Sequence, residues 1–226
     1  MVYNWLEALC PLCRCPAAAG AGLCTVCRAD LPWLGHACSH CALPLPPGAG
    51  VTCGPCLRRP SPVARTICAL RYQTPISGLI SAFKFHRDLA AGAALAKLLQ
   101  HAVLNHPEAP TLPAAILPVP LHHSRLRQRG YNQALELAKP VANALQLPLL
   151  TTAVSRERAT ADQIGLSALQ RRRNLRAAFT VHALLPPHIA IVDDVLTTGA
   201  TVLTLAKCLR AAGVEQISVW CLARTV

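Results

Sequence analysis

The stretch Ile191–Val202 reads IVDDVLTTGATV and combines a buried-strand pattern with groups that suit a polar ligand. The apolar run before it delivers Asp193 and Asp194 to the carboxyl end of a strand, where open α/β sheets bind their ligands. TTGAT then leads into a predicted helix beginning near Thr201, whose N–H groups and dipole suit a phosphate. A ligand with vicinal hydroxyls and a phosphate would satisfy both halves. The alternative is an ordinary strand, turn and helix with a threonine N-cap.

The sequence around this stretch predicts alternating strands and helices. Strand patterns occupy residues 66–73, 114–121, 188–195 and 216–224. Helical patterns occupy residues 75–85, 89–104, 132–147 and 201–213, and we expect Pro140 to bend or end the third of these and Gly213 to cap the last. This alternation predicts an α/β domain with a mainly parallel sheet.

The N-terminal part has a different composition, with many Cys, Pro and Gly residues. We therefore predict a small domain at 1–62 and an α/β domain at 63–226. Eight of the 12 cysteines form four C-x-x-C pairs: Cys10, Cys13, Cys24, Cys27, Cys38, Cys41, Cys53 and Cys56.

These pairs predict two structural zinc sites. Each C-x-x-C turn supplies two thiolates, two turns complete a tetrahedron, and a closed four-sulfur shell leaves no position for catalysis. We expect the pairs to combine sequentially, although cross-braced pairing uses the same residues. Free structural thiols or an iron–sulfur cluster are the alternatives. Without metal this segment should unfold.

The bulk composition favours a phosphate-bearing partner. There are 22 Lys and Arg residues against 10 Asp and Glu, which gives a formal net charge of +12. The chain begins without a basic, apolar leader, and no apolar run approaches the roughly 18 residues of a membrane span. We therefore expect a cytoplasmic protein that does not insert into a membrane.

Two basic segments provide further candidates for anion binding. LHHSRLRQRGYNQ, at 121–133, places Arg125, Arg127 and Arg129 in a predicted loop, and guanidinium groups match phosphate oxygens in pairs. A second basic segment runs from Arg156 to Phe179. Solvated surface charge is the alternative in both segments.

IVDDVLTTGATV resembles the phosphoribosyl pyrophosphate (PRPP) motif of type I phosphoribosyltransferases. Four features resemble, in order along nearly the whole chain, the ComF family of competence-associated proteins, including the ComFC and GntX types. They are the cysteine pairs, LPVPLHHSRLRQRGYNQ at 117–133, TADQIGLSALQRRRNLRAAF at 160–179 and the PRPP motif. By analogy with this family Lys84 lies near the nucleotide site, although an exposed helix face is equally compatible with this lysine. The resemblance implies a double zinc ribbon before a type I phosphoribosyltransferase domain, in which Asp193 and Asp194 bind the ribose hydroxyls. It implies that the PRPP-binding segment is Val195, Leu196, Thr197, Thr198, Gly199, Ala200 and Thr201. It also implies pyrophosphate and flexible loops that carry Arg127, Arg129, Asn132, Gln133, Arg156, Gln163, Arg171 and Asn174.

Two functional hypotheses follow. The first is a Mg²⁺-dependent phosphoribosyltransferase, a glycosyltransferase that binds PRPP or another phosphorylated ribose and has an acceptor that the sequence does not identify. The second is a non-enzymatic single-stranded DNA-binding module that uses the PRPP fold for nucleotide or phosphate binding, and it agrees with the family's association with DNA uptake. Competence or recombination proteins are then the expected partners. A purely structural zinc scaffold leaves the two acids and the phosphate loop without a role.

Overall fold

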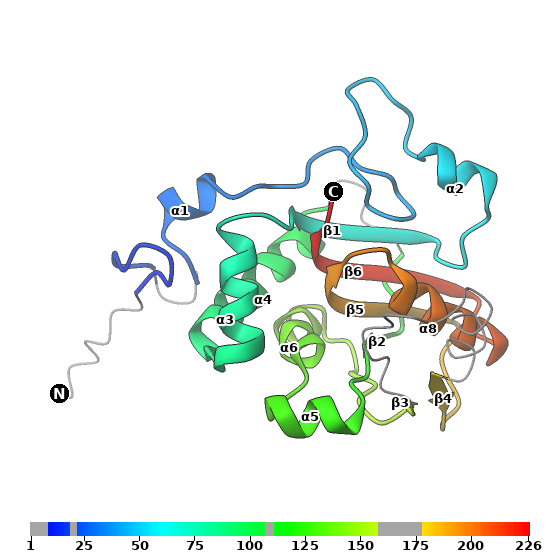
Figure 1. The fold of residues 1–226 in the computed structure, drawn as a ribbon. Helices are drawn as coiled ribbons and strands as arrows, with labels where there is room; N and C mark the ends of the chain where they lie inside the picture. Colours follow the sequence, from blue (N-terminus) through cyan, green and yellow to red (C-terminus); the bar gives the residue numbers. More distant parts are fainter. Residues whose placement is uncertain (1–8, 19–21, 107–110, 158–177) are drawn as a thin grey trace, which may run out of the picture.

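The computed structural model describes residues 9–18, 22–106, 111–157 and 178–226 (Figure 1). Its strands and helices alternate through most of the chain, as the sequence predicts. The strands are β1 (Arg65–Arg71), β2 (Ala115–Pro118), β3 (Val154–Arg156), β4 (Phe179–Val181), β5 (His188–Leu196) and β6 (Gln216–Arg224). The helices are α1 (Thr25–Ala29), α2 (Gly54–Arg58), α3 (Ile76–His86), α4 (Leu89–Leu104), α5 (His123–Arg129), α6 (Gln133–Leu145) and α8 (Ala200–Ala211).

Four strands form a parallel sheet in the order β1-β6-β5-β2. Both of its faces are covered, by α3, α4 and α6 on one side and by α8 on the other (Figure 1). Neighbouring residues of β5 therefore enter different cores: Val192 packs with α4 and α6, and Ile191 packs with α8. This confirms a mainly parallel α/β sheet preceded by a cysteine-rich module.

Helix α6 does not end near Pro140, which was one of the two outcomes expected there. The helix continues to Leu145, with Pro140 inside it. Residues on both sides of the proline, including Leu137 and Val141, are fully buried against the core. Tertiary packing therefore outweighs the hydrogen bond that proline cannot donate.

The segment predicted as a basic loop contains α5, so that prediction was wrong. His122 caps the helix by accepting a hydrogen bond from the backbone N–H of Ser124, and Gly130 ends it in the left-handed conformation at φ 85°. Histidine is an uncommon cap, which is why the sequence pattern did not reveal this helix start.

Strands β3 and β4 form a small antiparallel ribbon that the sequence did not predict. Arg156, expected in a mobile loop, is the last residue of β3. Gln163, Arg171 and Asn174 lie outside the described residues.

The N-terminal module lies along the outer edge of β1. The backbone N–H of Leu34 donates to Ala69 (3.1 Å), and that of Arg71 donates to Pro32 (2.8 Å). Near the other end of the strand, the N–H of Thr66 donates to the carbonyl of Ser39 (2.6 Å). The module thus satisfies polar groups that an edge strand would otherwise expose.

Candidate functional site

The structure gathers the eight cysteines of the C-x-x-C pairs into two groups of four. Cys10, Cys13, Cys24 and Cys27 form one group; Cys38, Cys41, Cys53 and Cys56 form the other. Within each group all four Sγ atoms lie within 4.8 Å of one another. The sequential pairing is therefore confirmed, and cross-braced pairing is excluded.

Both groups have dimensions that suit zinc. The Sγ atoms of Cys13 and Cys24 are 3.6 Å apart, as are those of Cys41 and Cys53. A tetrahedron with Zn–S distances of about 2.3 Å has sulfur–sulfur edges of about 3.8 Å. A disulfide would need a separation of about 2.05 Å, so these are free thiols arranged for a metal ion.

The second group is the more enclosed, since Cys38 and Cys53 are both buried. Burial raises the pKa of Cys38, but hydrogen bonds from backbone N–H groups, first that of Cys53, outweigh it and lower the pKa to about 6. A thiolate is the form that binds metal. His36 and His40 hydrogen-bond the carbonyls of Ala49 and Val63, and neither belongs to the four-sulfur group.

Asp193 and Asp194 lie within β5 rather than beyond its end. Strand β2 pairs with β5 only as far as Val192, whereas β6 continues alongside to Leu196. The two acids therefore occupy the section of β5 that has lost its neighbour on the β2 side. This gives their side chains access to a polar pocket.

Lys84 of α3 forms an ion pair with one of the two acids, Asp194. Its Nζ lies 2.7 Å from Oδ2 of Asp194, and the side chains are only 19% and 13% exposed. Asp193 accepts a hydrogen bond from the backbone N–H of Asp194 at 2.9 Å. Of the two interpretations that the sequence allowed for Lys84, the structure supports a place in the site.

The two acids have different electrostatic environments. Burial and then the charge of Asp194 raise the pKa of Asp193 to about 7, although Lys84 and Arg156 oppose this shift. Asp193 therefore exchanges a proton near neutral pH. A ligand that donates hydrogen bonds to its carboxylate would favour the ionised form.

A polar pocket of about 150 Å³ lies beside the acids. The chain supplies its walls from β5, α3, α5, α6, β3 and the first turn of α8. The lining residues are Lys84, Val119, Leu121, Arg125, Arg129, Asn132, Gln133, Ala134, Arg156, Asp193, Asp194, Val195 and Thr201.

Three arginines bring positive charge to this pocket, and two of them rest on aromatic rings. The guanidinium carbon of Arg129 lies 5.4 Å from the ring centre of Phe85, and that of Arg156 lies 5.6 Å from that of Phe179. Burial lowers the pKa of both arginines, while nearby acids partly offset the effect. Arg125 is the third. Arg127 is not among the lining residues.

Two amides at the start of α6 line the same pocket. Asn132 caps the helix by accepting from the N–H of Ala134 (3.0 Å), and it donates to the carbonyl of Val119 (3.0 Å). Gln133 is only 2% exposed, and its Nε2 has no hydrogen-bond partner among the described residues. Buried amides are normally paired, so Gln133 has donor capacity available for a ligand.

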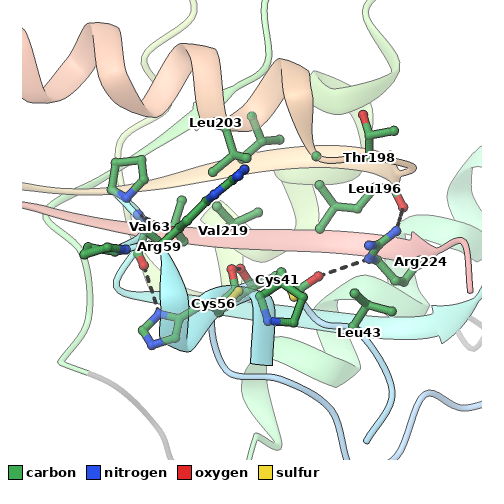
Figure 2. A pocket seen from close by; sticks show the side chains of 18 of the residues that line it. Cys41, Leu43, Cys56, Arg59, Val63, Leu196, Thr198, Leu203, Val219 and Arg224 are labelled. Atoms are coloured by element: carbon green, nitrogen blue, oxygen red, sulfur yellow. Dashed lines mark hydrogen bonds between the residues drawn. The ribbon is translucent and has the colours of Figure 1, made fainter. Parts of the chain in front are cut away.

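The segment after the acids divides between two cavities. Val195 and Thr201 line the small pocket, whereas Leu196, Thr198 and Gly199 line a larger one of about 480 Å³ (Figure 2). Gly199, with φ 74°, is the N-cap of α8, so a threonine does not cap this helix. Thr197 and Ala200 are exposed.

The larger cavity lies between α8 and the second cysteine group. Cys41 and Cys56 line one side, and Val202 and Leu203 line the other. Arg224, the last residue of β6, also lines it and is buried (Figure 2). Sequence analysis missed Arg224, and its only signal was a charged residue ending an apolar strand.

Comparison with known proteins gives one family model and several full-length relatives. Residues 6–57 match the double zinc ribbon domain. The chain is 40% identical over 226 residues to DNA utilization protein YhgH of Escherichia coli K12, covering 98% of this chain and 99% of that protein. It is 38% identical over 230 residues to competence protein F of Haemophilus influenzae, covering 99% of this chain and 100% of that protein.

Proposed function

The chain belongs to the family of DNA utilization protein YhgH and competence protein F, and from this premise we propose that it binds PRPP or another phosphorylated ribose beside Asp193 and Asp194. The observation that carries the proposal is the pocket in which these acids meet Lys84, Arg129 and Arg156. One pocket therefore contains both the acids that would accept hydrogen bonds from ribose hydroxyls and the cations that would bind phosphate.

Each part of such a ligand has suitable chemistry in the site. The carboxylates accept hydrogen bonds from two vicinal hydroxyls. Arg125, Arg129 and Nε2 of Gln133, which has no partner among the described residues, supply donors for pyrophosphate oxygens. The turn at residues 197–199 precedes α8, a 12-residue helix whose first N–H groups, with the hydroxyl of Thr201 in its first turn, suit the terminal phosphate.

Mg²⁺ fits this arrangement because its preferred ligands are the oxygens of carboxylates and phosphates. Asp193 and Asp194 would hold it together with the bound ligand, and it would neutralise pyrophosphate charge. The chain's own cations then bind and orient the phosphates, and transfer of the ribosyl group to an acceptor would rest mainly on positioning and electrostatics. The names of the relatives, DNA utilization protein and competence protein F, support a role for this chemistry in DNA utilization or competence.

Calorimetric titration with PRPP and Mg²⁺ tests the proposal. We expect saturable binding by the zinc-loaded wild type and a loss of at least about tenfold in affinity in an Asp193→Asn, Asp194→Asn double variant. Glu136→Gln is the matched control, because this acid is partly exposed on α6 and does not line the pocket. A folded wild type that does not bind PRPP would contradict the proposal.

A second candidate is single-stranded DNA binding. The net charge of +12 and the names of the relatives favour it. Binding should weaken steeply with salt and should persist in the double aspartate variant if DNA uses a different surface. Binding that is insensitive to salt would argue against a phosphate-backbone interaction.

A further inference from the structure

Arg224 connects the second zinc group to the phosphate loop. Its Nε donates to the carbonyl of Cys41 at 3.0 Å, and Cys41 belongs to that four-sulfur group. One of its terminal nitrogens donates to the carbonyl of Leu196 at 2.9 Å and also to that of Thr197. One side chain thus bridges Cys41 and the residues that lead into the loop (Figure 2).

The bridge lies in a place where its hydrogen bonds are difficult to replace. Arg224 is 8% exposed, so water has little access to the carbonyls that it satisfies. No acid is among the residues that line the cavity beside it. Backbone carbonyls are therefore the main acceptors for this buried charge, and losing one of them leaves polar groups unsatisfied.

Other contacts hold the same cysteine turn against the sheet. The hydroxyl of Thr66 donates to the carbonyl of His40 at 2.7 Å, and the N–H of Thr66 donates to Ser39 at 2.6 Å. The turn between Cys38 and Cys41 therefore has a fixed position relative to β1. Zinc at the second group would hold the shape of this turn and, with it, the Cys41 carbonyl.

The first zinc group is the natural comparison. Its member Cys10 and the nearby Leu23 pack in the core on the α4 side of the sheet, opposite the core that contains α8. Leu196, Thr198 and Gly199 share the larger cavity with Cys41 and Cys56, and no cysteine of the first group is among the residues that line it. The second metal site therefore lies beside the loop, whereas Cys10 of the first packs on the other side of the sheet.

We propose that Arg224 is a positioning residue that couples zinc occupancy of the Cys38, Cys41, Cys53 and Cys56 site to the conformation of the phosphate loop. The part of this coupling that concerns ligand affinity rests on the proposed function. Zinc at the second site orders the loop for the ligand's phosphate, and by linkage the bound ligand slows the release of that zinc ion. Zinc at the first site does neither.

Hydrogen exchange of the ligand-free protein gives the first test. We expect Arg224→Met and Cys56→Ser to speed exchange in peptides covering residues 195–203 by about tenfold. Arg224→Lys, which keeps the charge, should partly restore protection. The controls are Cys27→Ser in the first zinc group and Arg71→Met, which pairs with Arg224 in the strand register but is exposed.

Zinc release to a colorimetric chelator, with and without PRPP, gives the second test. In the wild type, PRPP should slow the release of one of the two zinc ions by about fivefold or more. Arg224→Met should remove this selective protection while still binding two zinc ions. If Arg224 had a structural role alone, its substitution would change the stability of the protein, but PRPP would not slow the release of either zinc ion.

The outcomes separate the two proposals. If the wild type does not bind PRPP, the proposed function fails and the exchange result alone decides the coupling. If PRPP binds but both zinc ions leave at unchanged rates, the coupling to ligand is wrong. Unchanged exchange at residues 195–203 in both Arg224→Met and Cys56→Ser would overturn the inference altogether.

Discussion

Asp193 links the pH dependence of stability to the candidate site. Its pKa of about 7 in the folded protein lies above the ordinary value of 3.8, so the unfolded chain releases this proton first as pH rises. Between these two values the folded state binds more protons, and the contribution of this group to stability falls with increasing pH. At pH 8 the folded protein therefore holds an unfavourable charge.

We expect Asp193→Asn to raise the melting temperature at pH 8 by a few degrees, since about 1 kcal/mol corresponds to roughly 2–4 °C in a chain of this size. The difference should narrow as the pH falls toward 4. Thermal unfolding followed by circular dichroism at several pH values measures it. A destabilised Asp193→Asn at pH 8 would refute this account.

Lys84 provides a second test at the same scale. Its ion pair with Asp194 is mostly shielded from water, so Lys84→Met should leave an acid without compensation and lower the free energy of unfolding by about 1–3 kcal/mol. Adding Asp194→Asn should recover part of this loss in a double-mutant cycle. Denaturant unfolding supplies the energies.

Lys139→Met is the matched control for Lys84. Its pair with Glu136 has the same 2.7 Å separation, but the side chains are 49% and 33% exposed. Exposed pairs contribute little, so the loss should stay below about 1 kcal/mol. Equal losses at Lys84 and Lys139 would show that burial does not determine the strength of the Asp194 pair.

Among the elements, the contact between α3 and α4 determines where Lys84 lies. Gly92 of α4 faces Phe83 so closely that an added Cβ would come within 2.6 Å of its ring carbon Cδ2. Phe83 is adjacent to Lys84 and is only 2% exposed. The glycine therefore sets the distance between the helices.

We expect Gly92→Ala to destabilise the protein by about 1–3 kcal/mol through overpacking, although alanine is the better helix former. Gly78→Ala in α3 is the control, because nothing lies within 4 Å of its added Cβ. It should stabilise the helix by about 0.5–1 kcal/mol. Urea unfolding measures the change in the free energy of unfolding for both variants. Changes of the same sign would contradict the packing explanation.

The elements also show where sequence patterns were informative. The helical pattern of 89–104 and the apolar run at 216–224 predicted α4 and β6, because α4 packs against the sheet and β6 is buried on both faces. Helix α5 has no buried residue, and β3 and β4 have three residues each. Such short or exposed elements depend on caps and tertiary contacts, which leave little periodicity.

For the molecule as a whole, the cysteine spacing and the motif at Ile191–Val202 predicted two metal groups and a strand end that carries acids. The spacing could not reveal that the second metal group lies next to the turn that follows β5, because Cys41 and Arg224 are 183 residues apart in sequence. Arg129 could be nominated from charge, but its stacking on Phe85 depends on how α3 and α5 meet. Contacts between elements distant in sequence were therefore the missing part.

The N-terminal module also protects an edge of the sheet. Strand β1 is terminal in the order β1-β6-β5-β2, and the described contacts on its outer side come from Leu34, Ser39 and Pro32. These residues lie in or before the second cysteine group. Loss of zinc should release them and leave the polar groups of β1 free to pair with another chain.

We expect chelation under reducing conditions to remove two zinc ions per chain and to cause association at micromolar concentration, because an exposed edge strand templates pairing. Size-exclusion chromatography with light scattering would show growing mass, and hydrogen exchange would show loss of protection at Thr66 and Arg71. Cys56→Ser should associate more readily than Cys27→Ser, because its cysteine group lies beside Thr66. A metal-free chain that stays monomeric with β1 protected would contradict this role, since the strand would then keep its edge contacts without zinc.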